Sequence, residues 1–123
     1  MANPSTPEPR GICNAAAAIA RLDGMVDVYS DVVTGFLDDD EGYLRRLNEC
    51  VERDDANGAH RTAHTLKGLA SMCGAESAAV ACAMLEKEAE SSTTTRRREL
   101  LRLIEAELTA ARIGLAIYLR PRA

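Results

Sequence analysis

Apolar residues recur at steps of four and three through segment 59–73 of the chain. They are Ala59, Ala63, Leu66, Ala70 and Cys73. Segment 76–90 repeats the pattern with Ala78, Cys82, Leu85 and Ala89. Steps of this size place side chains on one face of an α-helix, whereas the side chains of a strand alternate every second residue. The two segments are therefore expected to be helices that bury their apolar faces in one core.

Helical patterns also account for most of the remaining chain. Further helices are expected over residues 13–22, 25–37, 43–53 and 96–119. No strand-like alternation appears, and a chain with one phenylalanine, three tyrosines and no tryptophan needs an aliphatic core. The fold class is therefore predicted to be all-α. The expected architecture is an antiparallel four-helix bundle, formed by the last four of these six helices, with two additional N-terminal helices packed across one end.

Polar clusters indicate where these helices begin and end. The acidic cluster 38–41 is interpreted as the end of one helix and the start of the next, because carboxylates favour helix N-termini. Asp38 and Glu41 also have the spacing of a capping box. A carboxylate metal site in this cluster is the weaker alternative. Gly74 is expected to cap the helix before it, and the run 91–95 is expected to supply an N-cap.

One domain is expected for a chain of 123 residues. Residues 1–10 contain three prolines and are predicted to be a disordered leader, and residues 11–120 are predicted to form the helical domain. The net charge of −4 argues against a general nucleic-acid binder. The basic run 96–98 is interpreted as a solvated first helical turn.

Cysteine usage and hydropathy indicate a cytoplasmic protein. The four cysteines are well separated and form no CxxC pair, so they are expected to be small buried thiols in a reducing compartment. No segment has the apolar length of a membrane span or the apolar core of a signal peptide. We therefore expect neither a membrane nor a nucleic acid among the partners.

The most informative motif for function is the run from His64 to Gly68. His64, Lys67 and Gly68 stand at positions i, i+3 and i+4, which share one helix face. Together with Ser71 they form a stripe beside the buried one, so the imidazole is expected to be exposed. An exposed imidazole can attack an activated phosphoryl group such as an acyl phosphate on another protein. Lys67 would then offset the phosphoryl charge, and Gly68 would leave room for the partner.

The same helix face is also compatible with simpler roles. The histidine and glycine can be ordinary surface residues, and the chain can be a non-catalytic helical adaptor that docks a signalling partner. His60 and His64 have the i, i+4 spacing of a zinc site, but no third ligand is evident. We assign no metal site. Ser71, His60 and Arg61 are the residues expected to contact a docked partner.

Segment 63–70, followed by Gly74 and Ala75, resembles the signature of histidine-containing phosphotransfer (HPt) domains. Similarity extends from about residue 15 to residue 119, and includes the turn 22–24, Tyr29 and Phe36 before the motif and Cys82 with Leu85-Glu86 after it. Asp23 departs from the family pattern, because that turn often carries a second glycine.

The resemblance implies a phosphorelay protein that does not bind ATP and has no kinase activity of its own. His64 would accept a phosphoryl group from a receiver-domain aspartate and pass it to another receiver, with Lys67 and Gly68 as its usual neighbours. The implied partners are response-regulator receiver domains and a hybrid sensor histidine kinase. No cofactor is expected on this chain, and Mg²⁺ is expected on the partner receiver.

Overall fold

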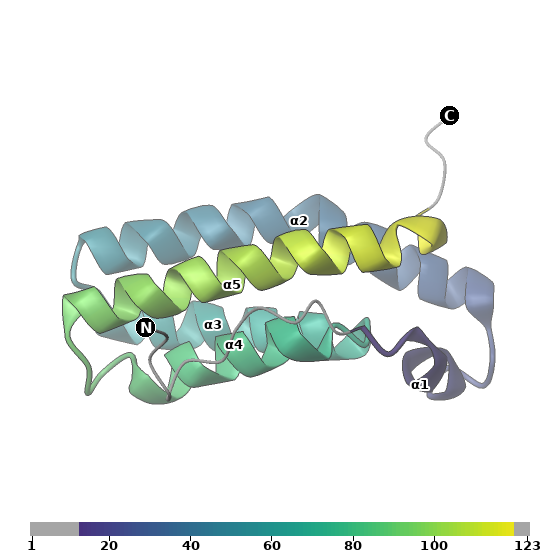
Figure 1. Cartoon of the computed structure of the whole chain (residues 1–123), viewed down its shortest axis with the longest axis horizontal. Coiled ribbons are helices and arrows are strands. Elements are labelled where there is room, and N and C mark those ends of the chain that lie inside the picture. The colour runs from purple at the N-terminus through teal and green to yellow at the C-terminus, as the bar shows by residue number, and fades with distance from the viewer. Residues whose placement is uncertain (1–12, 120–123) are drawn as a thin grey trace, which may run out of the picture.

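Four long helices lie side by side in the computed structural model, which describes residues 13–119 (Figure 1). The helices are α1 (Ala15–Ala20), α2 (Val26–Glu52), α3 (Ala56–Met72), α4 (Glu76–Glu88) and α5 (Thr94–Leu115), and a 3₁₀ turn, η1 (Ala116–Tyr118), follows α5. All regular elements of the described residues are helical, so the all-α prediction is confirmed. The leader predicted over residues 1–10 lies outside the described residues.

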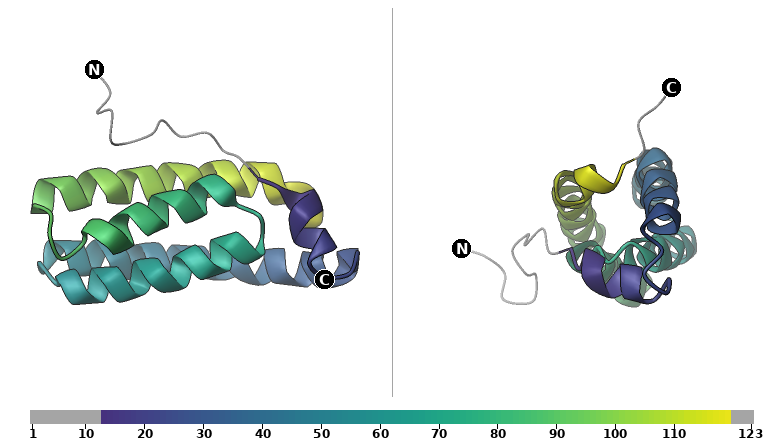
Figure 2. Two further views of the ribbon diagram at one scale, coloured as in Figure 1. Left: turned by 90° about the horizontal axis from the view of Figure 1, so that it is seen from below. Right: turned by 90° about the vertical axis from the view of Figure 1, so that its right-hand side faces the viewer.

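The long helices enclose a single core. α2 packs against α3 and α5, and α4 packs against the same two helices. Seen along the helix axes, the four surround a common centre, and α1 lies across the end where α3 turns into α4 (Figure 2). A backbone hydrogen bond of 2.7 Å from Asn14 to Gly74 ties the start of α1 to that turn. Because α1 covers only one end, the outer faces of α3 and α4 lie on the surface along the length of the bundle.

The predicted apolar stripes of α3 and α4 form the centre of this core. Every residue of both stripes is buried, with at most 1% of its surface exposed. Helix α5 adds a third buried stripe, which consists of Leu100, Ile104, Leu108, Ala111 and Leu115. The Tyr29 hydroxyl of α2 donates a 2.5 Å hydrogen bond to the Cys73 carbonyl and so satisfies the end of α3. Burial raises the pKa of Tyr29 to about 12, so this hydroxyl stays protonated.

The prediction of two helices over residues 25–53 was wrong. A single helix, α2, runs through the acidic cluster 38–41, so the bundle has one additional N-terminal helix instead of two. Asp40 points inward, is 3% exposed, and forms an ion pair with Arg112 of α5, whose guanidinium donates a 2.9 Å hydrogen bond to its carboxylate. Because an aspartate costs a helix less than about 0.7 kcal/mol, the buried face that continues past Asp40 outweighs the local signal to stop.

Most predicted helix ends are close to the observed ones. Gly74 has a φ of +75°, as its capping role requires, and Thr93 is the N-cap of α5. The Asp55 side chain accepts a 2.9 Å hydrogen bond from the Gly58 amide, so α3 begins three residues earlier than expected. The last helix stops at residue 115 and tightens into η1 instead of continuing to residue 119.

The basic run 96–98 is not the solvated turn that was predicted. Arg97 is 8% exposed, and it donates to the carbonyls of Ala89 and Ser92 and pairs with the Asp54 carboxylate. One arginine therefore holds the α4–α5 loop against the α2–α3 turn. The run has a structural role in closing this end of the bundle.

The structure also bears on the expectations about membrane spans and cysteines. No helix within the described range is both long and apolar enough to cross a membrane. The four cysteines are free thiols, of which Cys73 and Cys82 are buried as predicted, while Cys13 and Cys50 are only half-buried.

Candidate functional site

His64 lies in the middle of α3, on the face that the bundle leaves open. Its neighbours Ala63 and Leu66 are fully buried, whereas 64% of the His64 side chain is exposed. The predicted exposure is therefore confirmed, since the imidazole stands beside the buried stripe and not within it. The helical core below fixes the backbone of His64 while leaving the ring accessible to a partner.

The carboxylate of Glu86, on the neighbouring helix α4, bridges His64 and Lys67. Its Oε1 lies 2.6 Å from Nδ1 of His64, and its Oε2 lies 2.6 Å from Nζ of Lys67. The hydrogen bond from Lys67, assisted by the one from His64, lowers the pKa of Glu86 below its usual value. Burial opposes this shift but does not reverse it. Glu86 is therefore ionised at neutral pH.

The ionised carboxylate also determines which nitrogen of His64 is free. A carboxylate accepts hydrogen bonds and donates none, so Nδ1 must carry the proton of their shared bond. In the neutral ring, Nε2 then keeps its lone pair and points away from Glu86. The site thus holds a nucleophilic nitrogen in a fixed orientation, with a carboxylate behind the ring and an ammonium group one helical turn away.

Gly68 leaves open space beside the imidazole. A Cβ atom built at this position would meet no atom within 4 Å outside its own stretch of helix. Packing inside the protein therefore does not require glycine there. Since glycine costs a helix about 1 kcal/mol relative to alanine, its use here agrees with a need for clearance on the outside.

The predicted docking residues lie in three different settings. Ser71 is exposed, and its carbonyl accepts a 2.9 Å hydrogen bond from the guanidinium of Arg21. Arg61 is exposed on the side of α3 that faces α2. His60 is half-buried, and its Nδ1 lies 2.7 Å from the Glu86 carbonyl, so this ring braces α3 against α4.

The alternative zinc site finds no supporting cluster in the structure. Among residues 13–119, no group of three or more histidine, cysteine, aspartate or glutamate side chains is arranged to hold a metal ion. Nδ1 of both His60 and His64 faces Glu86, one towards its backbone and one towards its side chain.

Glu86 is the site residue that the sequence reasoning missed. The sequence contained a signal, because His64 and Glu86 lie at equal separations from Ala75, the N-cap of α4. In an antiparallel helix pair, residues at equal distances from the turn face each other. A polar residue next to the buried stripe of α4 at that position was therefore a candidate partner of His64.

This fold and this site define a class of protein, a helical bundle with an exposed histidine in the middle of one of its long helices. The particular family follows from comparison with known families. The model of the Hpt domain matches residues 31–114, which is more than half of the chain, and the match includes His64 and Glu86. The chain therefore belongs to the Hpt domain family, whose members transfer phosphoryl groups in two-component signalling and interact with receiver domains and kinases. No curated protein and no solved structure gave a significant match.

Proposed function

We propose that this protein is the intermediate carrier of a phosphorelay, which takes a phosphoryl group from a receiver-domain aspartate onto His64 and passes it to a second receiver. The observation that carries the proposal is the Glu86 bridge, which fixes the proton of the His64 ring at Nδ1 and leaves Nε2 free in an exposed position.

The transfer step is a displacement at phosphorus. The lone pair of Nε2 attacks the phosphorus of the aspartyl phosphate, and the bond from phosphorus to the aspartate oxygen breaks. The electron pair of that bond returns to the partner's carboxylate. Positive charge develops on the imidazole as the N–P bond forms, and the Glu86 carboxylate at Nδ1 stabilises it. The reverse step on another receiver releases the phosphoryl group from His64.

Lys67 neutralises charge at the same place. Its ammonium group lies 2.6 Å from Glu86 and is one-third exposed, so its flexible side chain can also reach towards phosphoryl oxygens beside His64. Mg²⁺, which would be bound by the receiver and not by this chain, would supply further charge neutralisation. The carrier then needs no cofactor of its own.

The surroundings of His64 suit docking of a receiver. Gly68 provides clearance for the approach, and Ser71 and Arg61 flank the imidazole as contact residues. We propose a receiver of a hybrid sensor histidine kinase as the donor and a response-regulator receiver as the acceptor. All of these exchanges would take place in the cytoplasm.

The proposal is tested by substituting His64 and, as a matched control, His60. Wild-type protein and the two variants, His64→Gln and His60→Gln, are incubated with receiver domains carrying radiolabelled aspartyl phosphate. We expect wild type and His60→Gln to take up acid-labile, alkali-stable label, and His64→Gln to take up none while it keeps its helical circular dichroism. Label on a folded His64→Gln variant would refute the assignment.

A further inference from the structure

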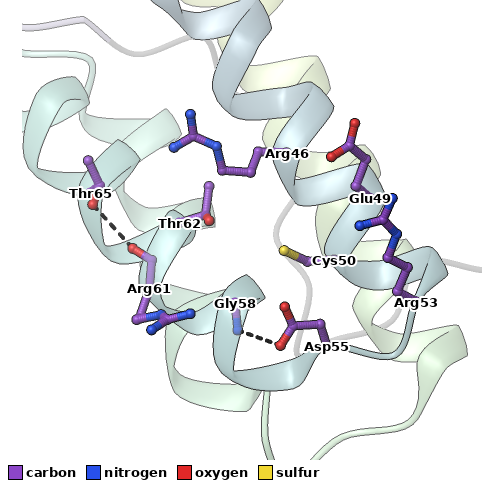
Figure 3. Close-up of a pocket in the computed structure, with 9 residues that line it drawn as sticks. All are labelled: Arg46, Glu49, Cys50, Arg53, Asp55, Gly58, Arg61, Thr62 and Thr65. Carbon is purple, nitrogen blue, oxygen red and sulfur yellow. Dashed lines mark hydrogen bonds between the residues drawn. The ribbon is translucent and has the colours of Figure 1, made fainter.

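A polar groove runs between α2 and the first half of α3 (Figure 3). It has a volume of about 420 Å³ and is open to solvent. Three arginines line it, namely Arg46 of α2, Arg53 at the C-cap of α2 and Arg61 of α3. The hydroxyl groups of Thr62 and Thr65 lie on its α3 wall.

The three groove arginines have no acidic partner within the described part of the chain. Other arginines are engaged, for example Arg97 with Asp54 and Arg112 with Asp40. Arg46, Arg53 and Arg61 form no such ion pair, although the guanidinium of Arg46 lies 5.3 Å from the ring centre of Tyr43.

Two carboxylates also line the groove, but they do not cancel its charge. Asp55 caps α3 through its hydrogen bond from the Gly58 amide, and Glu49 makes no ion pair with a described residue. Three guanidinium groups against two carboxylates leave the groove positive in a chain whose net charge is −4. An anionic group is therefore the ligand that the groove favours.

The groove lies next to the proposed phosphorylation site. Arg61 is one helical turn before His64, and Thr65 directly follows it. Three residues of a helix span about 4.5 Å, whereas a specific protein interface covers about 800 Å² of each partner. A protein that covers His64 therefore also covers the mouth of the groove.

From this placement we propose that the groove binds an acidic segment of the receiver that exchanges its phosphoryl group with His64. The proposal rests on the proposed function. Guanidinium groups hold carboxylates through paired hydrogen bonds, and such contacts would orient the receiver on α2 and α3 before transfer. Charge attraction of this kind accelerates encounter more than it changes the chemical step.

Phosphoryl transfer between receiver and carrier tests this surface. The double variant Arg46→Glu/Arg53→Glu reverses two groove charges, and Arg45→Glu/Arg102→Glu makes the same change of net charge on exposed arginines that do not line the groove. We expect the groove variant to lower kcat/KM about tenfold, with kcat at saturating receiver unchanged and a weaker dependence on salt. Equal losses in both double variants would overturn the proposal.

A binding measurement separates this proposal from the proposed function. Fluorescence anisotropy would follow a labelled glutamate-rich peptide as it binds each double variant and the wild type. Binding by wild type and the control variant, but not by the groove variant, supports the groove as an acidic-segment site. The peptide can show this binding pattern while wild type and both double variants transfer at equal rates, and the receiver is then not the occupant of the groove. The same conclusion holds if the peptide binds in this pattern but wild type accepts no phosphoryl group. Peptide binding that is absent or equal throughout, or inorganic phosphate binding in its place, overturns the groove proposal alone.

Discussion

Replacement of Glu86 by glutamine tests the most specific feature of the site. The wild-type carboxylate holds Nδ1 of His64 and Nζ of Lys67, each at 2.6 Å. Glutamine has nearly the same shape but no charge, so its amide oxygen can still accept from Nδ1 while the ion pair to Lys67 is lost. Alanine removes both interactions. The two variants therefore separate the charge of Glu86 from its hydrogen bond.

The expected size of the effect follows from the exposure of the site. A hydrogen bond to a charged group contributes about 1.5–3 kcal/mol, and the low end, about 1.5 kcal/mol, applies because the His64 side chain is 64% exposed. A neutral acceptor retains about 0.5 kcal/mol of this. Because the bond strengthens as the ring becomes positive, its loss falls on the transition state. Transfer should therefore slow about fivefold in Glu86→Gln and about tenfold in Glu86→Ala.

Two measurements check this prediction. Single-turnover transfer from a phosphorylated receiver gives the rate, and the ¹⁵N chemical shifts of the His64 ring report which nitrogen carries the proton. We expect protonated Nδ1 in the wild type and a mixture of tautomers in Glu86→Ala. The matched control is Glu90→Gln, at an exposed position in the turn that follows α4, which should transfer at the wild-type rate. Wild-type rates and an unchanged Nδ1 proton in both Glu86 variants would refute the reasoning.

Further predictions concern clearance, buried charge and thiols. Gly68→Ala should raise the free energy of unfolding by up to about 1 kcal/mol, while Gly68→Leu should slow transfer at least tenfold at similar stability in urea; equal transfer rates would rule out a clearance role. Burial raises the pKa of Asp40, although Arg112 opposes the shift, so the contribution of Asp40 to stability falls as pH rises through that pKa. The free energy of unfolding of Asp40→Asn minus that of wild type, measured in urea, should therefore be larger at pH 7 than at pH 3. A smaller difference at pH 7 would contradict this. Burial raises the pKa of Cys82 to about 12, so iodoacetamide should label it far more slowly than the half-buried Cys50, as followed by mass spectrometry; comparable rates would contradict its burial.

The sequence predicted the parts of the fold that depend on regular spacing. The stripes of α3 and α4 were identified correctly because every position is apolar, and a helix with one fully apolar face has few other ways to bury it. The exposure of His64 followed from the same geometry. The Gly74 cap was also predictable, since a positive φ favours glycine.

Features that depend on contacts between distant residues were not predicted. The inward position of Asp40 within α2 depends on its contact with Arg112, which lies 72 residues away in the chain. The burial of Arg97 rests on loop carbonyls whose position is set by the whole bundle. Glu86 joins the site only because α4 folds back along α3. Local patterns contain no direct record of the first two contacts, and they indicate the third only through the equal separations of His64 and Glu86 from Ala75.

Localisation of the phosphoryl group tests the central claim most directly. The protein, with ¹⁵N-labelled histidine, is incubated with a phosphorylated receiver from the same organism, and ³¹P and ¹⁵N NMR spectra then identify the nitrogen bonded to phosphorus. The account predicts a single phosphohistidine, with phosphorus on Nε2 of His64 and the proton retained on Nδ1. Phosphorus on Nδ1, on His60 or on a residue other than histidine would contradict it.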